Sequence, residues 1–155
     1  MIVIVHTSPV DTLNGGDPRL PPADTEALRE VFDLTVRDTS AAEARRRTLA
    51  WLLRHSVGQE AAEAAVLIIS ELVTNAVVHS GSSVIGCALR LGSGVLQIEV
   101  TDQGAGQQEP ALREPAADDV SGRGLLLVSA VSKAWGVTPV VPSGRTVWAT
   151  VLIAD

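Results

Sequence analysis

The sequence predicts an α+β protein, a two-layer sandwich with helices on one face of a mixed, mostly antiparallel sheet. Three observations predict this class. Two helical segments follow one another at residues 41–55 and 60–79, later apolar runs come in pairs joined by glycine-containing turns, and no βαβ unit is visible. With 155 residues, of which 46% are hydrophobic and 19% charged, the chain has enough apolar material for one buried core.

The first half of the chain combines strand, loop and helix signals. Residues 1–5 and 30–37 are rich in β-branched and apolar side chains and predict strands, whereas the proline- and glycine-containing segment 7–23 predicts a loop. Ser40 is expected to cap the first helix, with Glu43 as its capping-box partner. The second helix is predicted to turn one apolar stripe to the core: Ala65, Ile69, Leu72 and Ala76.

The second half of the chain predicts two hairpins separated by a loop and a helix. The acidic segment 107–121 has no periodicity and is long enough for a functional loop, and residues 125–133 predict a short helix. The hairpin strands are expected at 84–91, 95–101, 135–141 and 146–152. We therefore divide the chain into an N-terminal extension, residues 1–30, and one domain, residues 31–155.

Composition excludes several classes of protein. The net charge of −6 argues against a binder of nucleic-acid phosphates, which needs a basic face. A single cysteine excludes an internal disulfide and zinc sites of the CxxC type. No apolar run approaches the roughly 18 residues of a membrane span, and no signal peptide is apparent at the start. These observations predict a cytoplasmic protein that binds neither nucleic acid nor a membrane.

Three polar residues of the second helix share one stripe. Glu71, Asn75 and His79 are spaced four residues apart, so they lie on one side of the helix beside the apolar stripe. Asparagine is a poor residue for a helix interior, because its amide competes for backbone hydrogen bonds. A functional row and a half-exposed polar border explain this pattern equally well.

Two glycine-rich segments follow. Asp102 ends a strand and is followed by Gly104 and Gly106, a spacing that allows a ligand to touch backbone, although a plain turn has the same composition. The segment Gly122-Arg123-Gly124 opens a helix, where free backbone N–H groups attract anions, although a capped linker also fits. Each segment alone is a weak signal.

Taken together and in this order, the segments resemble the GHKL superfamily of ATP-binding domains. Residues 71–79 resemble its N box, residues 102–106 its G1 box, residues 122–128 its G2 box, and residues 144–148 its last, threonine-bearing strand. The similarity extends from about residue 41 to residue 152 and implies the Bergerat (GHKL ATPase) fold. Within the superfamily, the sequence of these segments most resembles that of the bacterial anti-sigma factor serine-protein kinases, the RsbW and SpoIIAB-like group.

The resemblance implies a role for each motif residue. Asp102 would accept a hydrogen bond from the adenine amine, supported by Thr146; Asn75 would bind Mg²⁺; and Glu71 would be the catalytic base. The remaining expected nucleotide-binding residues are Gly104 and Gly106 beside the nucleotide, and Gly122, Arg123, Gly124 and Leu125 at the phosphates. Val78 replaces a basic residue that many histidine-kinase relatives carry, so Arg123 gains importance for phosphate binding.

The resemblance also implies partners: a sigma factor, a STAS-domain anti-anti-sigma factor as the substrate, and a second copy in a homodimer. The expected function is an anti-sigma factor that binds ATP and Mg²⁺, sequesters the sigma factor and phosphorylates a serine of the STAS protein. The alternatives are a non-catalytic binding module, in which ATP is structural or absent, and an unrelated small enzyme of α+β fold.

Overall fold

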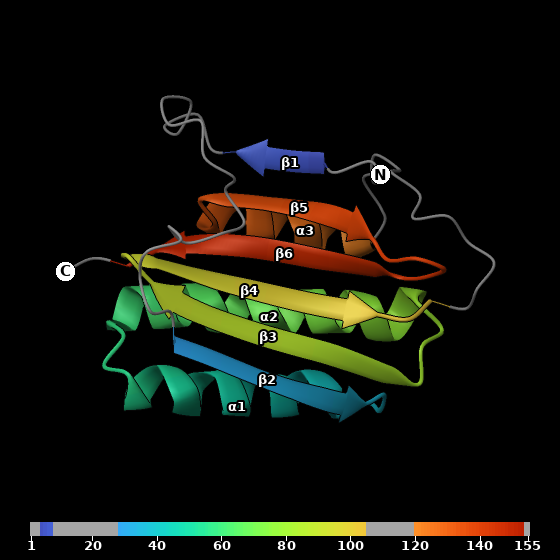
Figure 1. Ribbon diagram of the computed structural model, residues 1–155, viewed down its shortest axis with the longest axis horizontal. Coiled ribbons are helices and arrows are strands. Elements are labelled where there is room, and N and C mark those ends of the chain that lie inside the picture. Colours follow the sequence, from blue (N-terminus) through green and yellow to red (C-terminus); the bar gives the residue numbers. More distant parts are fainter. Residues whose placement is uncertain (1–3, 8–27, 105–119, 154–155) are drawn as a thin grey trace.

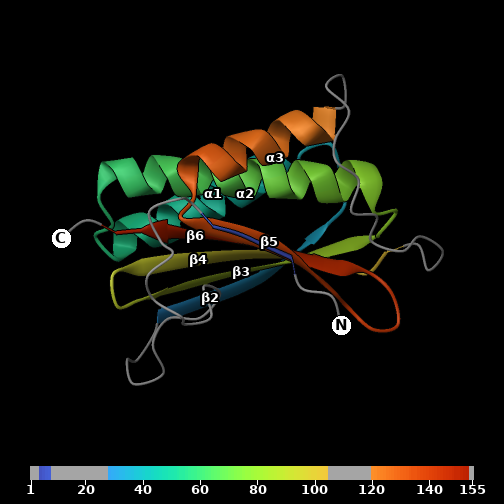
Figure 2. The ribbon, with the colours of Figure 1, turned by 90° about the horizontal axis from the view of Figure 1, so that it is seen from above.

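Six strands form a single sheet, and three helices cover one of its faces (Figures 1 and 2). The computed structural model describes residues 4–7, 28–104 and 120–153. The strands are β1 (Ile4–Thr7), β2 (Leu28–Thr35), β3 (Val84–Gly92), β4 (Val95–Asp102), β5 (Ala134–Pro139) and β6 (Arg145–Leu152). The helices are α1 (Ser40–Arg54), α2 (Gln59–His79) and α3 (Val120–Val131).

The strands are ordered β1-β5-β6-β4-β3-β2, and every pair of neighbours among the described strands is antiparallel. The two-layer α+β sandwich is therefore confirmed, while the expected mixed sheet is wrong, since the described part contains no parallel pair. β1 pairs with β5, and β2 spans the boundary predicted between residues 30 and 31.

The core lies between the sheet and the helices. Alternate residues of β4, namely Leu96, Ile98 and Val100, face α2, whose Ile69 and Leu72 are almost fully buried. The only cysteine, Cys87, lies in this core, where burial raises the pKa of its thiol to about 12. The predicted apolar stripe of α2 is thus confirmed.

The length and composition of α2 would allow it to cross a membrane, which the short apolar runs of the sequence did not suggest. Half of its apolar window is buried inside the domain. Because this helix lies between α1, α3 and the sheet, its hydropathy is explained by packing in the core (Figure 2).

Two local predictions need correction. Ser40 does not form a capping box with Glu43: its hydroxyl donates to the Thr35 carbonyl and accepts the Arg37 N–H, while Glu43 pairs with Arg47. The third helix was expected at residues 125–133 but extends over Val120–Val131. Gly122 and Gly124, which the sequence predicts to lead into the helix, lie inside it.

Candidate functional site

The predicted site residues gather at one end of the molecule. α2 and β4 both end there, and β6 begins there, at the right in Figure 1. Seen from above, α3 also begins near the end of α2 (Figure 2). A hydrogen bond of 2.6 Å from the Gln103 N–H to the Ser82 hydroxyl ties the segment after α2 to the end of β4. Segments far apart in sequence therefore share this end.

The polar stripe of α2 passes from the interior to the surface. Glu71 is half-buried, Asn75 is buried and His79 is exposed at the last turn. In the described part of the chain, the Asn75 amide has no hydrogen-bond partner. A buried amide normally finds a partner, so Asn75 is suited to receive one from a ligand.

Asp102 is the most buried charged side chain of the candidate site. It is the last residue of β4, it retains 4% of its exposure, and its Oδ2 lies 3.6 Å from Nε of Arg145. Burial raises the pKa of Asp102, and the Arg145 charge and a hydrogen bond from the Gly104 backbone N–H oppose that rise. A carboxylate in this setting is a strong, fixed hydrogen-bond acceptor.

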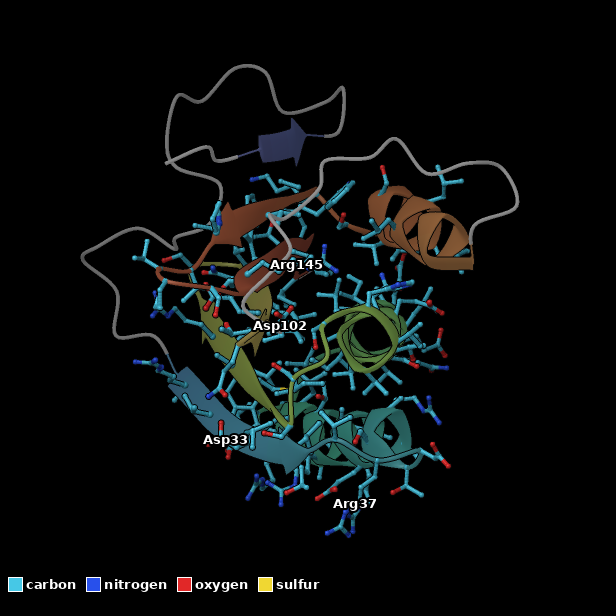
Figure 3. The ribbon with its side chains drawn as sticks, turned by 90° about the vertical axis from the view of Figure 1, so that its right-hand side faces the viewer. Asp33, Arg37, Asp102 and Arg145 are labelled. Atoms are coloured by element: carbon cyan, nitrogen blue, oxygen red, sulfur yellow. The ribbon has the colours of Figure 1, made fainter. Side chains whose placement is uncertain are left out.

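Asp102 and Thr146 lie on opposite faces of the sheet. The register pairs Asp102 with Arg145 and Thr101 with Thr146. Asp102 follows the core-facing residues of β4, so Arg145 faces the core with it, beside the end of α2 in Figure 3. Thr146 lies on the opposite face, where its hydroxyl is 2.8 Å from that of Thr101. The structure thus does not bring Thr146 together with Asp102.

Arg145 is the site residue that motif reading missed. It lies directly after Gly144 in the segment that resembles the last strand of the superfamily, but its side chain carries no motif signature. The antiparallel register of β4 with β6 is the signal that identifies it, because the cross-strand partner of Asp102 shares its face.

Gly104 and Gly144 pack against each other's backbone. Both have positive φ, +67° and +99°, and a Cβ on Gly104 would lie 2.8 Å from the Gly144 nitrogen. The Ser143 hydroxyl also donates to the Gln103 carbonyl, at 2.7 Å. The close approach that Gly104 permits is therefore to the β5–β6 turn, and it fixes the chain just after Asp102. Gly106 lies outside the described residues.

The start of α3 holds the predicted phosphate-binding segment. Gly122, Arg123 and Gly124 lie in its first turns, and their side-chain environment is outside the described part. The four backbone N–H groups left free at a helix start belong here to residues 120–123. Leu125, which is half-buried, follows them, so the expected anion-binding start lies earlier in the chain than predicted.

These residues fit an adenine nucleotide with a divalent cation. The buried Asp102 carboxylate complements an amine donor, and the Asn75 amide, which has no hydrogen-bond partner among the described residues, offers one oxygen ligand. Among the described residues, no group of three His, Cys, Asp or Glu side chains is placed to hold a metal ion. Mg²⁺ bound through phosphate oxygens and water needs only one or two protein ligands, which agrees with a lone asparagine.

Comparison with known proteins identifies the family of the domain. Residues 34–151 match the family model of the histidine kinase-like ATPase domain. No curated protein matches the chain. The fold is similar to the crystal structure of the RsbU and RsbW domains of Rv1364c from Mycobacterium tuberculosis, with a TM-score of 0.63 and 21% sequence identity. That match covers 81% of this chain and 32% of the other. The chain therefore belongs to the histidine kinase-like ATPase domain family, whose GHKL fold the sequence predicted.

Proposed function

We propose that this protein is an ATP-dependent anti-sigma factor that sequesters a sigma factor and phosphorylates a serine of a STAS-domain anti-anti-sigma protein. The observation that carries the proposal is the α2 stripe, which holds Glu71 one helical turn before the buried Asn75 at the end where Asp102 lies. The similarity of the fold to a structure that includes an RsbW domain supports it.

Each residue of the site has a distinct task in this reaction. Asp102 would accept a hydrogen bond from the adenine amine, and the Asn75 amide oxygen would ligate Mg²⁺. The half-buried Glu71 orients the serine hydroxyl of the partner and accepts its proton. When bound, ATP would supply the phosphoryl group, and Mg²⁺ would neutralise part of its charge. Because phosphoryl transfer depends mainly on positioning and charge neutralisation, one base and one metal ligand are sufficient protein chemistry.

A transfer assay tests the catalytic assignment. The full chain is incubated with radiolabelled ATP, Mg²⁺ and the STAS-domain protein from the same source, and the phosphoserine formed is measured. Glu71→Gln is expected to lower the transfer rate by about 10²–10⁴-fold, the usual effect of a general base, without abolishing ATP binding. Glu63→Gln is the matched control, because Glu63 is an exposed glutamate of the same helix.

Two outcomes contradict the proposal. Transfer at the wild-type rate by the Glu71→Gln variant would remove Glu71 as the base. No transfer by the wild-type protein, with sigma factor binding intact, would identify a regulator that acts by binding alone.

A further inference from the structure

Arg145 is the positively charged side chain that contacts Asp102. It faces the core as the cross-strand partner of Asp102, and its Nε lies 3.6 Å from the Asp102 carboxylate. Its side chain retains 27% of its exposure, whereas that of Asp102 retains 5%. The arginine side chain is therefore the more solvent-accessible partner of this pair.

The pair leaves hydrogen-bonding capacity on both partners. A distance of 3.6 Å exceeds the roughly 2.7–2.9 Å of a charge-assisted hydrogen bond, so Arg145 is not locked onto the carboxylate. A guanidinium carries five N–H donors, and a carboxylate offers about four lone-pair sites. The backbone N–H groups of Gly104 and Arg145 and the weaker contact with the Arg145 side chain use three of these sites, so Asp102 can accept one further hydrogen bond from a ligand.

A neighbouring acceptor and donor match the edge of adenine. The exocyclic amine of adenine donates, and the adjacent ring nitrogen N1 accepts. Guanine presents a carbonyl oxygen and an N1–H at the same two positions, so both of its groups would oppose the protein groups. Thr146 cannot supply the donor from the other face of the sheet, where it pairs with Thr101.

We propose that Arg145 is a specificity-determining residue that donates a hydrogen bond to N1 of the adenine ring while Asp102 accepts from the exocyclic amine. The inference rests on the adenine-binding role given to Asp102 in the proposed function. Arg145 has a second effect at this place, because its positive charge favours the ionised, accepting form of the buried carboxylate. Arg145 would thus contact the adenine ring directly and also favour the form of Asp102 that binds the exocyclic amine.

An analogue that lacks N1 isolates the contact. In 1-deaza-ATP a C–H group replaces N1 and the exocyclic amine is kept. Titration calorimetry with the full chain and Mg²⁺ compares ATP with 1-deaza-ATP for the wild type, Arg145→Met and Arg145→Lys. Arg54→Met is the control, because Arg54 lies on the exposed surface of α1, paired with Glu30.

The wild type is expected to bind 1-deaza-ATP about tenfold or more weakly than ATP, as for loss of a hydrogen bond to a charged group. Arg145→Met should bind the two ligands equally, within about twofold, while Arg54→Met keeps the wild-type ratio and Arg145→Lys keeps part of it. A merely structural role of Arg145 would weaken both ligands alike and leave the ratio unchanged.

Three results overturn the inference. The first is equal affinity of the wild type for ATP and 1-deaza-ATP, which requires no variant to fold. The second is an unchanged ratio in Arg145→Met, and the third is tighter ATP binding by that variant, which would make Arg145 a plug over Asp102. Failure of serine phosphorylation with the ratio intact contradicts only the kinase assignment, whereas no ATP binding contradicts both.

Discussion

At the scale of single residues, the chemistry of the candidate site depends on keeping a buried carboxylate charged. Asp102 is almost fully buried, and burial alone favours its protonated form. A protonated carboxyl would present a donor where adenine also presents one. Arg145 and the Gly104 N–H therefore favour the ionised form of Asp102, which the proposed adenine-binding role requires.

The titration of Asp102 tests this balance. In the ligand-free wild type, the carboxyl carbon signal of Asp102 is expected to titrate in NMR spectra above the ordinary value of 3.8, because burial raises its pKa. Arg145→Met should move the midpoint higher still, since the favourable charge is lost. Arg54→Met should leave it in place, and an unmoved midpoint in Arg145→Met would contradict the coupling.

The raised pKa of Asp102 determines how its contribution to stability changes with pH. The folded protein binds this proton more tightly than the unfolded chain does. The contribution of Asp102 to stability is thus fully present below the unfolded pKa and is lost as the pH rises through the folded pKa. Burial of this carboxyl therefore makes ionisation of Asp102 destabilising for the folded state.

At the scale of secondary structure, α2 joins the core to the site. Its buried face contains Ile69 and Leu72, and the adjacent stripe contains Glu71 and Asn75. Since these stripes share one rigid helix, the packing of the first fixes the position of the second. Substitutions on the buried face of α2 are therefore expected to disturb both the core and the candidate site.

Truncation of one core side chain of α2 tests the packing. Ile69→Ala is expected to lower the free energy of unfolding by about 2–5 kcal/mol, because Ile69 is fully buried and a cavity would remain. Val78→Ala, on the exposed side of the same helix, should change it by less than about 0.5 kcal/mol. Urea denaturation measures both, and equal effects would contradict the assigned faces.

The same scale shows what the sequence could predict. Helical periodicity located α2 to within one residue, and the glycine turn located the hairpin of β3 and β4. Local signals were less informative at the start of α3, because the two glycines there have low helix propensity and nevertheless lie in the helix.

Sequence could not decide between Thr146 and Arg145 as the neighbour of Asp102. The pairing of β4 with β6 joins segments more than forty residues apart, and its register comes from packing of the whole sheet. A shift of one residue would reverse every side chain between the two faces. Motif similarity identifies the segment, whereas only the register identifies the side chain.

At the scale of the whole molecule, four chain segments meet at one end of a continuous core. The ends of α2 and β4 and the starts of β6 and α3 are separated in sequence but close in the fold (Figures 1 and 2). A ligand that bridges them would bind the folded state alone. Such binding stabilises the native protein by mass action.

Thermal unfolding measures this linkage. ATP with Mg²⁺ at about 100 times its Kd is expected to add about 2.7 kcal/mol to stability and to raise Tm by roughly 5–10 °C for a domain of this size. Asp102→Asn should abolish the shift. Asp33→Asn should keep it, because Asp33 is an exposed strand aspartate that lies apart from Asp102 in Figure 3. An equal shift in both variants would contradict the role of Asp102.

Cys87 gives the molecule an internal reporter of its own fluctuations. Alkylating reagents attack the thiolate, and this thiol is sealed inside the sheet with a pKa of about 12. Because no other cysteine competes for the reagent, each alkylation event marks one transient exposure of the β3 interior. The labelling rate therefore measures how often the domain opens transiently and exposes Cys87.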